Sequence, residues 1–320
     1  MSIGVALSTL EHDRPEHLLR DADVALYRAK AQGKARHAVF DTSMDAQALE
    51  RLELETDLRH AARRGELLVH YQPIVDLVTG RVCEVEALIR WLHPVRGMIP
   101  PLQFIPLAEE TGLIIPIGRW ILAEACRQTR RWQEELPTVP PLTLSVNISA
   151  RQLQHPTLIE EIAEVLAETG LDPSTLRLEI TESVVMEDAE STSEMLLKLK
   201  RLGIELAIDD FGTGYSSLSY LHRFPFDAVK INRSFVTQIG TSMRDATIIR
   251  AIVALAKSLQ LSLTAEGIES TEQLRELRDL GCNRGQGYLL SKPEPPEAIP
   301  ALLAVRHEGQ LAAAMLRPIA

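Results

Sequence analysis

The chain has 320 residues, of which 45% are hydrophobic and 24% are charged, enough for one large core or two modest ones and unlike a disordered composition. No apolar run approaches the roughly 20 residues that span a bilayer, and the first residues lack the basic and apolar parts of a signal peptide, so we expect a cytoplasmic protein, whether or not a longer parent chain carries an anchor. The net charge of −10 argues against a surface for double-stranded nucleic acid.

The first 41 residues predict a short α/β fragment. Apolar strands are expected at 2–7 and 37–41, and between them a helix that begins at Pro15 and ends near Gly33. This fragment is too small to enclose a core of its own. The stretch 42–65 follows, with leucines at 49, 52, 54 and 58 and Gly65 at its end, and it predicts a connecting helix.

From residue 66 to 320 strands and helices alternate. The expected strands are 67–77, 81–91, 142–149, 176–183, 204–211, 227–234, 261–269 and 286–293, and the helices between them include 156–170, 188–203, 244–260 and 271–281. About eight βα units in one domain favour a TIM-like (β/α)8 barrel. The hairpin around Thr79 and Gly80 adds one antiparallel strand. An open, doubly wound sheet is the alternative.

Polar side chains stand at or near the expected end of almost every strand. They are Glu86, Asn147, Glu179, Asp209, Asp210, Lys230, Glu266 and Gln286. In a βα barrel these ends share one face, where barrel enzymes place their sites. Each residue has a simpler interpretation as a helix cap or a solvated side chain, and Asp210 alone could cap a turn.

As a set, these carboxylates require cations. Oxygen ligands suit Mg²⁺ or Mn²⁺, and the adjacent pair Asp209 and Asp210 favours two ions, an arrangement that serves phosphodiester hydrolysis. Zinc has no support, because Cys83, Cys126 and Cys282 are odd in number and far apart and the nine histidines form no HxxxH pair. The sequence also has no Ser-His-Asp, GxGxxG or Walker A motif. We therefore expect buried thiols and a two-metal hydrolase.

An ordered set of motifs supports this expectation. They are YQPI at 71–74, EAL at 86–88, SVNIS at 145–149, LEITES at 178–183, DDFGTGYSSL at 209–218, VKIN at 229–232, AEGIE at 265–269 and QGYLLSKP at 286–293. From about Asp45 to the C-terminus the chain resembles the EAL-domain cyclic di-GMP phosphodiesterases of bacterial signalling. The resemblance implies hydrolysis of cyclic di-GMP to linear pGpG. The alternative is an inactive EAL domain that serves as a cyclic di-GMP receptor.

The resemblance also implies roles for individual residues. One metal would be held by Glu86, Asn147, Glu179 and Asp209, and the second by Asp209, Asp210 and Glu266, the last directly or through water. Lys230 would orient or deprotonate the attacking water, with Glu86 and Glu266 as the other catalytic residues. The substrate would contact Gln72, Arg90, Asp210 and Gln286, although Arg90 could equally form a surface ion pair.

Two carboxylates are expected to anchor the loop from Phe211 to Ser217. Glu182 and Glu269 match supporting positions of the family, and Glu182 would accept hydrogen bonds from loop N–H groups or from Thr213, Ser216 or Ser217. Alternatively, Glu182 caps the helix that begins near Asp188 or faces solvent. The apolar stretch 215–223 is consistent both with a homodimer contact and with a buried helix.

The N-terminal fragment resembles the last part of a GGDEF (diguanylate cyclase) domain over SIGVAL and 18–41. The GGDEF loop and the nucleotide-binding half of such a domain are not in this sequence. We expect either a piece of a longer GGDEF–EAL protein or a vestigial remnant, and in both cases no cyclisation of GTP.

Overall fold

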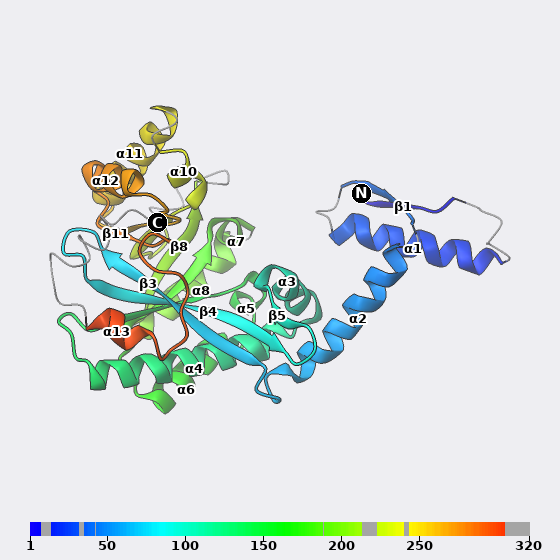
Figure 1. Cartoon of the computed structure of the whole chain (residues 1–320), viewed down its shortest axis with the longest axis horizontal. Coiled ribbons are helices and arrows are strands. Elements are labelled where there is room, and N and C mark those ends of the chain that lie inside the picture. The colour runs from blue at the N-terminus through cyan, green and yellow to red at the C-terminus, as the bar shows by residue number, and fades with distance from the viewer. Residues whose placement is uncertain are drawn as a thin grey trace. The chain divides into compact units, whose positions relative to one another are not determined.

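A computed structural model describes residues 1–7, 14–31, 35–41, 43–187, 189–212, 223–239 and 243–304. The chain divides into two compact units, Met1–Arg64 and Gly65–Ala320 (Figure 1). Among the described residues no helix is long and apolar enough to cross a membrane.

The first unit contains a small parallel sheet and two helices. Its elements are β1 (Ile3–Val5), α1 (Pro15–Ala31), β2 (His37–Val39) and α2 (Ser43–Ala61). Strand β1 pairs with β2, and α1 packs on both strands. Gly4 permits this close packing, because a Cβ atom there would lie 2.1 Å from the Ala22 carbonyl oxygen. The predicted N-terminal α/β fragment is confirmed.

The second unit is a closed barrel of eight strands. The strands are β3 (Leu67–Asp76), β4 (Val82–His93), β6 (Thr143–Asn147), β7 (Leu176–Thr181), β8 (Glu205–Phe211), β9 (Ala228–Ile231), β10 (Ser262–Ala265) and β11 (Arg284–Gly285). Their order is β3-β11-β10-β9-β8-β7-β6-β4, and pairing of β3 with β4 closes the ring. Strand β3 is antiparallel to both of its neighbours, and the other pairs in the ring are parallel. This confirms the predicted barrel with one antiparallel strand and excludes the open sheet.

Helices cover the outside of the barrel. They are α3 (Pro101–Thr111), α4 (Ile114–Glu135), α5 (Ala150–Leu153), α6 (Leu158–Thr169), α7 (Glu182–Glu187), α8 (Ala189–Arg201), α10 (Arg233–Thr237), α11 (Met243–Ser258), α12 (Thr271–Leu280) and α13 (Ile299–Leu303), together with the 3-10 turn Pro173–Thr175. Figure 1 shows α4 and α6 packed against each other beside the strands. A short strand, β5 (Gly97–Ile99), extends the β4 hairpin beyond the ring.

Strand residues alternate between an apolar outer face and a polar inner face. In β7, Leu178 and Ile180 are completely buried in the main apolar core, whereas Arg177 and Glu179 contact groups from other strands inside the ring. Successive strand residues point to opposite sides of a sheet. The fold therefore directs a set of charged side chains into the barrel.

Several expected strands end too late, among them 261–269, since β10 ends at Ala265. The strand expected at 286–293 is instead β11, which ends before Gln286, and the residues after it form turns. Strand β9 ends at Ile231 because the Asn232 side chain accepts the Ser234 N–H at 2.7 Å and caps α10. Strand β7 ends where α7 begins at Glu182. Helices α3 and α4 were not among the helices that we named from the sequence.

Candidate active site

Lys230, on β9, lies at the centre of a buried acidic cluster. Its Nζ atom is 2.7 Å from Glu179 Oε2, 2.7 Å from Glu266 Oε1, 3.1 Å from Glu86 Oε2 and 3.8 Å from Asp209 Oδ1. The four carboxylates come from β4, β7, β8 and the residue after β10. The barrel therefore brings together side chains that are spread over about 180 positions of the sequence.

One ammonium group does not balance four carboxylates. Burial, followed by repulsion from Glu86, raises the pKa of Glu179 well above its ordinary value. Burial likewise raises the pKa of Asp209, and it raises that of Glu266 to about 7. Despite its burial, the pKa of Lys230 is raised by the surrounding carboxylates. The cluster thus holds an excess of negative charge that added cations would neutralise.

Glu86 differs from the other acids because amides surround it. It accepts hydrogen bonds from Asn147 Nδ2 at 2.7 Å and from Gln286 Nε2 at 2.8 Å, in addition to Lys230. Burial alone would raise its pKa, but Lys230 and these donors lower the pKa of Glu86 below its ordinary value. We expected Glu86 at a strand exit, but it lies within β4, which continues to His93 in the hairpin with β5.

A bulge explains how two adjacent aspartates share one site. Neighbouring strand residues normally face opposite sides, but the pairing of β8 with β9 shifts between Ile208 and Phe211, and Asp210 adopts a left-handed φ of 57°. Bulges of this kind redirect side chains. Carboxylate oxygens of Asp209, Asp210 and Glu266 consequently lie within 4.8 Å of one another.

These residues fit a divalent cation. Hard cations bind several oxygen atoms, and Mg²⁺ prefers carboxylates. Glu179 Oε1 is buried without a hydrogen-bond partner among the described residues, as a ligand oxygen would be before a cation binds. The group Asp209, Asp210 and Glu266 provides a second set of oxygen atoms beside it.

The sequence analysis did not single out Asn232, whose Nδ2 donates to Asp210 Oδ1 at 2.5 Å. The available indication is its position two residues after Lys230, which places it on the same inward face.

Glu182 lies next to the bulge. Its side chain is 2% exposed, and Oε2 accepts the N–H of Gly212, the residue after β8, at 2.8 Å. The hydroxyl groups proposed as further partners, on Thr213, Ser216 and Ser217, lie outside the described residues, as does Asp188 of the alternative interpretation.

The proposed substrate residues lie near the cluster, but Glu269 does not join it. Gln286 Nε2 also donates to Gln72 Oε1 at 3.0 Å, which links both glutamines to Glu86. Arg90 is intermediate in exposure, its Nη1 donates to the Ile89 carbonyl oxygen at 2.8 Å, and burial lowers its pKa. The exposed carboxylate of Glu269 lies 3.9 Å from Arg233 Nη2.

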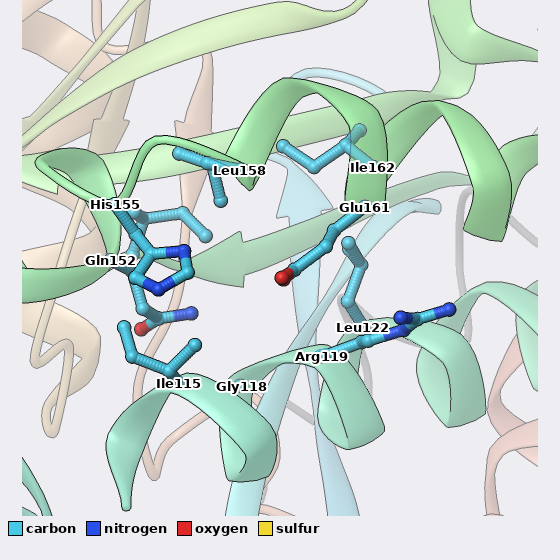
Figure 2. Close-up of a pocket in the computed structure, with 10 residues that line it drawn as sticks. Ile115, Gly118, Arg119, Leu122, Gln152, His155, Leu158, Glu161 and Ile162 are labelled. Atoms are coloured by element: carbon cyan, nitrogen blue, oxygen red, sulfur yellow. The ribbon is translucent and has the colours of Figure 1, made fainter. Parts of the chain in front are cut away.

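A small pocket elsewhere is not a second ligand site. Figure 2 shows it between α4 and α6, where the side chain of Glu161 points toward Gln152 and His155 above Gly118, and Arg119 extends away from them. Its volume is about 10 Å³, which holds about one water molecule.

The fold and cluster together define a βα-barrel protein with a buried acidic cluster contributed by several strands of the ring. The EAL domain family model matches residues 55–293, and the chain belongs to the EAL domain family. Proteins of this family use metal ions, in agreement with the acidic cluster.

Curated relatives are similar over nearly the whole chain. An uncharacterised signalling protein of Caulobacter vibrioides is 45% identical over 97% of this chain and 38% of its own length. The bifunctional diguanylate cyclase/cyclic di-GMP phosphodiesterase MucR of Pseudomonas aeruginosa is 45% identical over 95% of this chain and 44% of its own length. The chain spans less than half the length of these relatives.

Solved structures share the fold. The phosphodiesterase of PaMucR in complex with c-di-GMP has a TM-score of 0.74 at 46% identity and covers 77% of this chain and 99% of its own. The cAMP-bound EAL enzyme Bd1971 has a TM-score of 0.76 at 32% identity, and the match covers 92% of this chain and 76% of the Bd1971 chain.

Proposed function

We propose that this chain hydrolyses one phosphodiester bond of cyclic di-GMP and releases linear pGpG. The observation that carries the proposal is the cluster itself, in which four of the five predicted carboxylate ligands surround Lys230 and the fifth, Asp210, lies beside Asp209 and Glu266. Relatives named as cyclic di-GMP phosphodiesterases, such as NbdA of P. aeruginosa and PdeR of Escherichia coli, are each 41% identical to this chain.

The proposed metal ligands are those that the motifs imply. Glu86, Asn147, Glu179 and Asp209 would hold one ion, and Asp209, Asp210 and Glu266 the other. Bound Mg²⁺ or Mn²⁺ would supply a water of lowered pKa and compensate charge on the phosphate.

Lys230 orients the attacking water in this proposal. The two alternatives were orientation and deprotonation, and a raised pKa favours the ammonium form, which donates hydrogen bonds. Its contacts hold Glu86, Glu179 and Glu266 in place, and its charge opposes the rise that burial causes in the pKa of each. Arg90 and the amides of Gln72 and Gln286 would bind the substrate, the guanidinium group contacting a phosphate oxygen.

The direct test is to incubate the purified chain with cyclic di-GMP and either Mg²⁺ or Mn²⁺ and to separate the products. We expect pGpG with metal and none in EDTA. Tight binding of cyclic di-GMP without turnover under either metal would instead support the alternative, an EAL domain that serves as a receptor.

We also propose that residues 1–41 of the first unit are the remnant of a GGDEF domain, with 42–65 as a connecting helix. The order β1, α1, β2 accompanies the motif resemblance of residues 2–7 and 18–41. The match to MucR, which is named as both a cyclase and a phosphodiesterase, extends over 95% of this chain. The proposed homodimer contact at 215–223 lies almost entirely outside the described residues and stays a prediction.

A further inference from the structure

A second layer of charged and polar side chains lies inside the barrel, two residues before the acidic cluster along the strands. Its members each precede a site residue by two positions on the same strand or at its end, so they share the inward face. The pairs are Glu84 with Glu86, Ser145 with Asn147, Arg177 with Glu179, and Arg284 with Gln286. We call Glu84, Ser145, Arg177 and Arg284 the lower layer.

Glu84 is the centre of this layer. Its side chain is 1% exposed, and it accepts hydrogen bonds from Ser145 Oγ, from Arg177 Nη1 and, at 2.9 Å, from Arg284 Nη1. Arg177 also pairs with Glu205. Burial opposes ionisation, but Arg177 and Arg284 lower the pKa of Glu84 below its ordinary value. The carboxylate is therefore charged and fully paired.

Arg284 belongs to the shortest strand of the ring. Strand β11 has two residues, Arg284 and Gly285, and it forms two residue pairs with β10 and two with β3. Glycine also follows Gln286, at position 287. Backbone hydrogen bonds hold both ends of this segment, from the Leu77 N–H to the Asn283 carbonyl oxygen and from the Gln286 N–H to the Ala265 carbonyl oxygen, each at 2.8 Å. Glycine gives little intrinsic order, so the side-chain contacts of Arg284 and Gln286 add to these bonds in fixing the position of the segment.

Two side-chain contacts connect β11 with β4 across the intervening strand β3. Figure 1 shows β11 next to β3, in agreement with their pairing. Arg284 contacts Glu84 in the lower layer, and Gln286 contacts Glu86 in the cluster. The contact between Arg284 and Glu84 lies two residues before the contact between Gln286 and Glu86 on both segments. The position of the first contact therefore sets where the second one forms.

We propose that Arg284 is a positioning residue of the active site, whose ion pair with Glu84 holds β11 where Gln286 donates to Glu86. Arg284 acts on Glu86 through Gln286 and touches no substrate. Removal of Arg284 leaves Glu84 paired with Arg177 and Ser145, so the barrel remains folded while Glu86 loses a fixed donor. The effect of Arg284 on metal binding does not depend on the proposed hydrolysis. Only a comparison of reaction rates would rest on the proposed function.

The test compares Arg284→Met with Lys200→Met as a matched control. Lys200 Nζ forms a similar ion pair, 2.7 Å from Asp227 Oδ2, with side-chain exposures of 29% and 33%, and within the described part of the chain it does not contact the cluster. The readout is the dissociation constant of Mn²⁺ measured by calorimetry on the full chain without substrate. We expect Arg284→Met to weaken Mn²⁺ binding about tenfold, as loss of an outer partner of a ligand does, and Lys200→Met to leave it unchanged.

Two more variants separate positioning from loss of stability. Arg284→Lys restores an ammonium donor and should recover most of the Mn²⁺ affinity. In a double-mutant cycle with Gln286→Leu, the Arg284→Met change should have little further effect, because residues that act through one contact are not additive. Thermal melts identify any variant that fails to fold, and Arg284→Gln, which keeps a donor, then replaces Arg284→Met in the titration.

Unchanged Mn²⁺ affinity in folded Arg284→Met would overturn the inference, as would equal weakening in Lys200→Met or full additivity with Gln286→Leu. If the wild-type chain binds Mn²⁺ and the variants behave as expected but cyclic di-GMP is not cleaved, the proposed function fails and the positioning role stands.

Discussion

The excess negative charge of the cluster can be measured through the pKa of Glu266. Its side chain is 20% exposed, and burial raises its pKa from 4.5 to about 7. A carboxyl group whose pKa is higher in the folded chain than in the unfolded chain stabilises the fold while it is protonated. That contribution is complete below the unfolded pKa and is lost as the pH rises through the folded value.

We therefore predict a pH-dependent difference between the wild type and Glu266→Gln in EDTA. From about pH 4 to pH 8, the free energy of unfolding of the wild type relative to the variant should fall by up to about 3 kcal/mol. Denaturant titrations across this range measure it. Parallel pH curves for the two proteins would contradict the raised pKa.

Glu86→Ala should abolish hydrolysis and leave the barrel folded. The change removes a proposed metal ligand, so we expect activity to fall by about 100-fold or more, at or beyond the upper range for loss of a supporting residue. Lys230 keeps its contacts with Glu179 and Glu266 in this variant. Product assays and thermal melts beside Glu164→Ala, an exposed acid on α6, check it. Wild-type turnover in Glu86→Ala would refute the metal assignment.

The sequence predicted the members of the cluster better than their geometry. Because inward residues recur every second position and parallel strands end together, the motifs indicated which carboxylates meet. The bulge at Asp210 could not be foreseen, since its left-handed φ of 57° is unusual for a residue with a side chain. Nor did the motifs reveal that the strand expected to end at residue 91 continues to His93 and pairs with β5.

At the scale of elements, the end of β8 is held by α7. Asp210 lies in the bulge, and Gly212, with a φ of 96°, gives the chain little order of its own. The buried Glu182, the first residue of α7, accepts the Gly212 N–H. This contact ties the strand end that carries two proposed ligands to a neighbouring helix.

Glu182→Ala should loosen that strand end without unfolding the barrel. We expect the metal concentration needed for half-maximal activity to rise by roughly 10-fold, with lower turnover, as for other outer partners of ligands. Titration of activity with Mn²⁺ measures the effect, and Glu182→Gln, which keeps an acceptor oxygen, is the matched control. Unchanged metal dependence together with wild-type turnover in Glu182→Ala would discard the anchoring role.

Elements were hardest to predict where glycine and proline lie inside them. Helix α3 contains Pro106, and α4 contains Gly118, although α4 buries Ile114, Ile117 and Leu122 at helical spacing. Gly118 packs against Gln152, because a Cβ atom at this position would lie 2.0 Å from Gln152 Nε2, and the helix forms despite the low helix propensity of glycine. Glycines also surround Gln286, where the expected long strand proved to be the short β11.

For the whole molecule, repeated βα units were sufficient to predict the barrel. The same repetition cannot show how the ring closes, and closure depends on β3 lying antiparallel between β4 and β11. The turn after β3 gave part of this information, because Asp76 accepts the N–H groups of Val78 and Thr79 and forms a tight hairpin. The pairing of β3 with the distant β11 had no counterpart in local sequence.

The division into two units leads to the last prediction, that deletion of residues 1–41 leaves hydrolysis intact. Within the first unit, β1, α1 and β2 contact one another, every proposed metal ligand lies between Glu86 and Glu266, and the family match begins at residue 55. Helix α2 is kept because Leu54 and Leu58 are buried. We expect kcat and KM to stay within about threefold of the full chain, a difference below 1 kcal/mol in transition-state stabilisation. A larger loss of kcat/KM with an unchanged melting temperature would contradict this and show that the N-terminal residues act on the site.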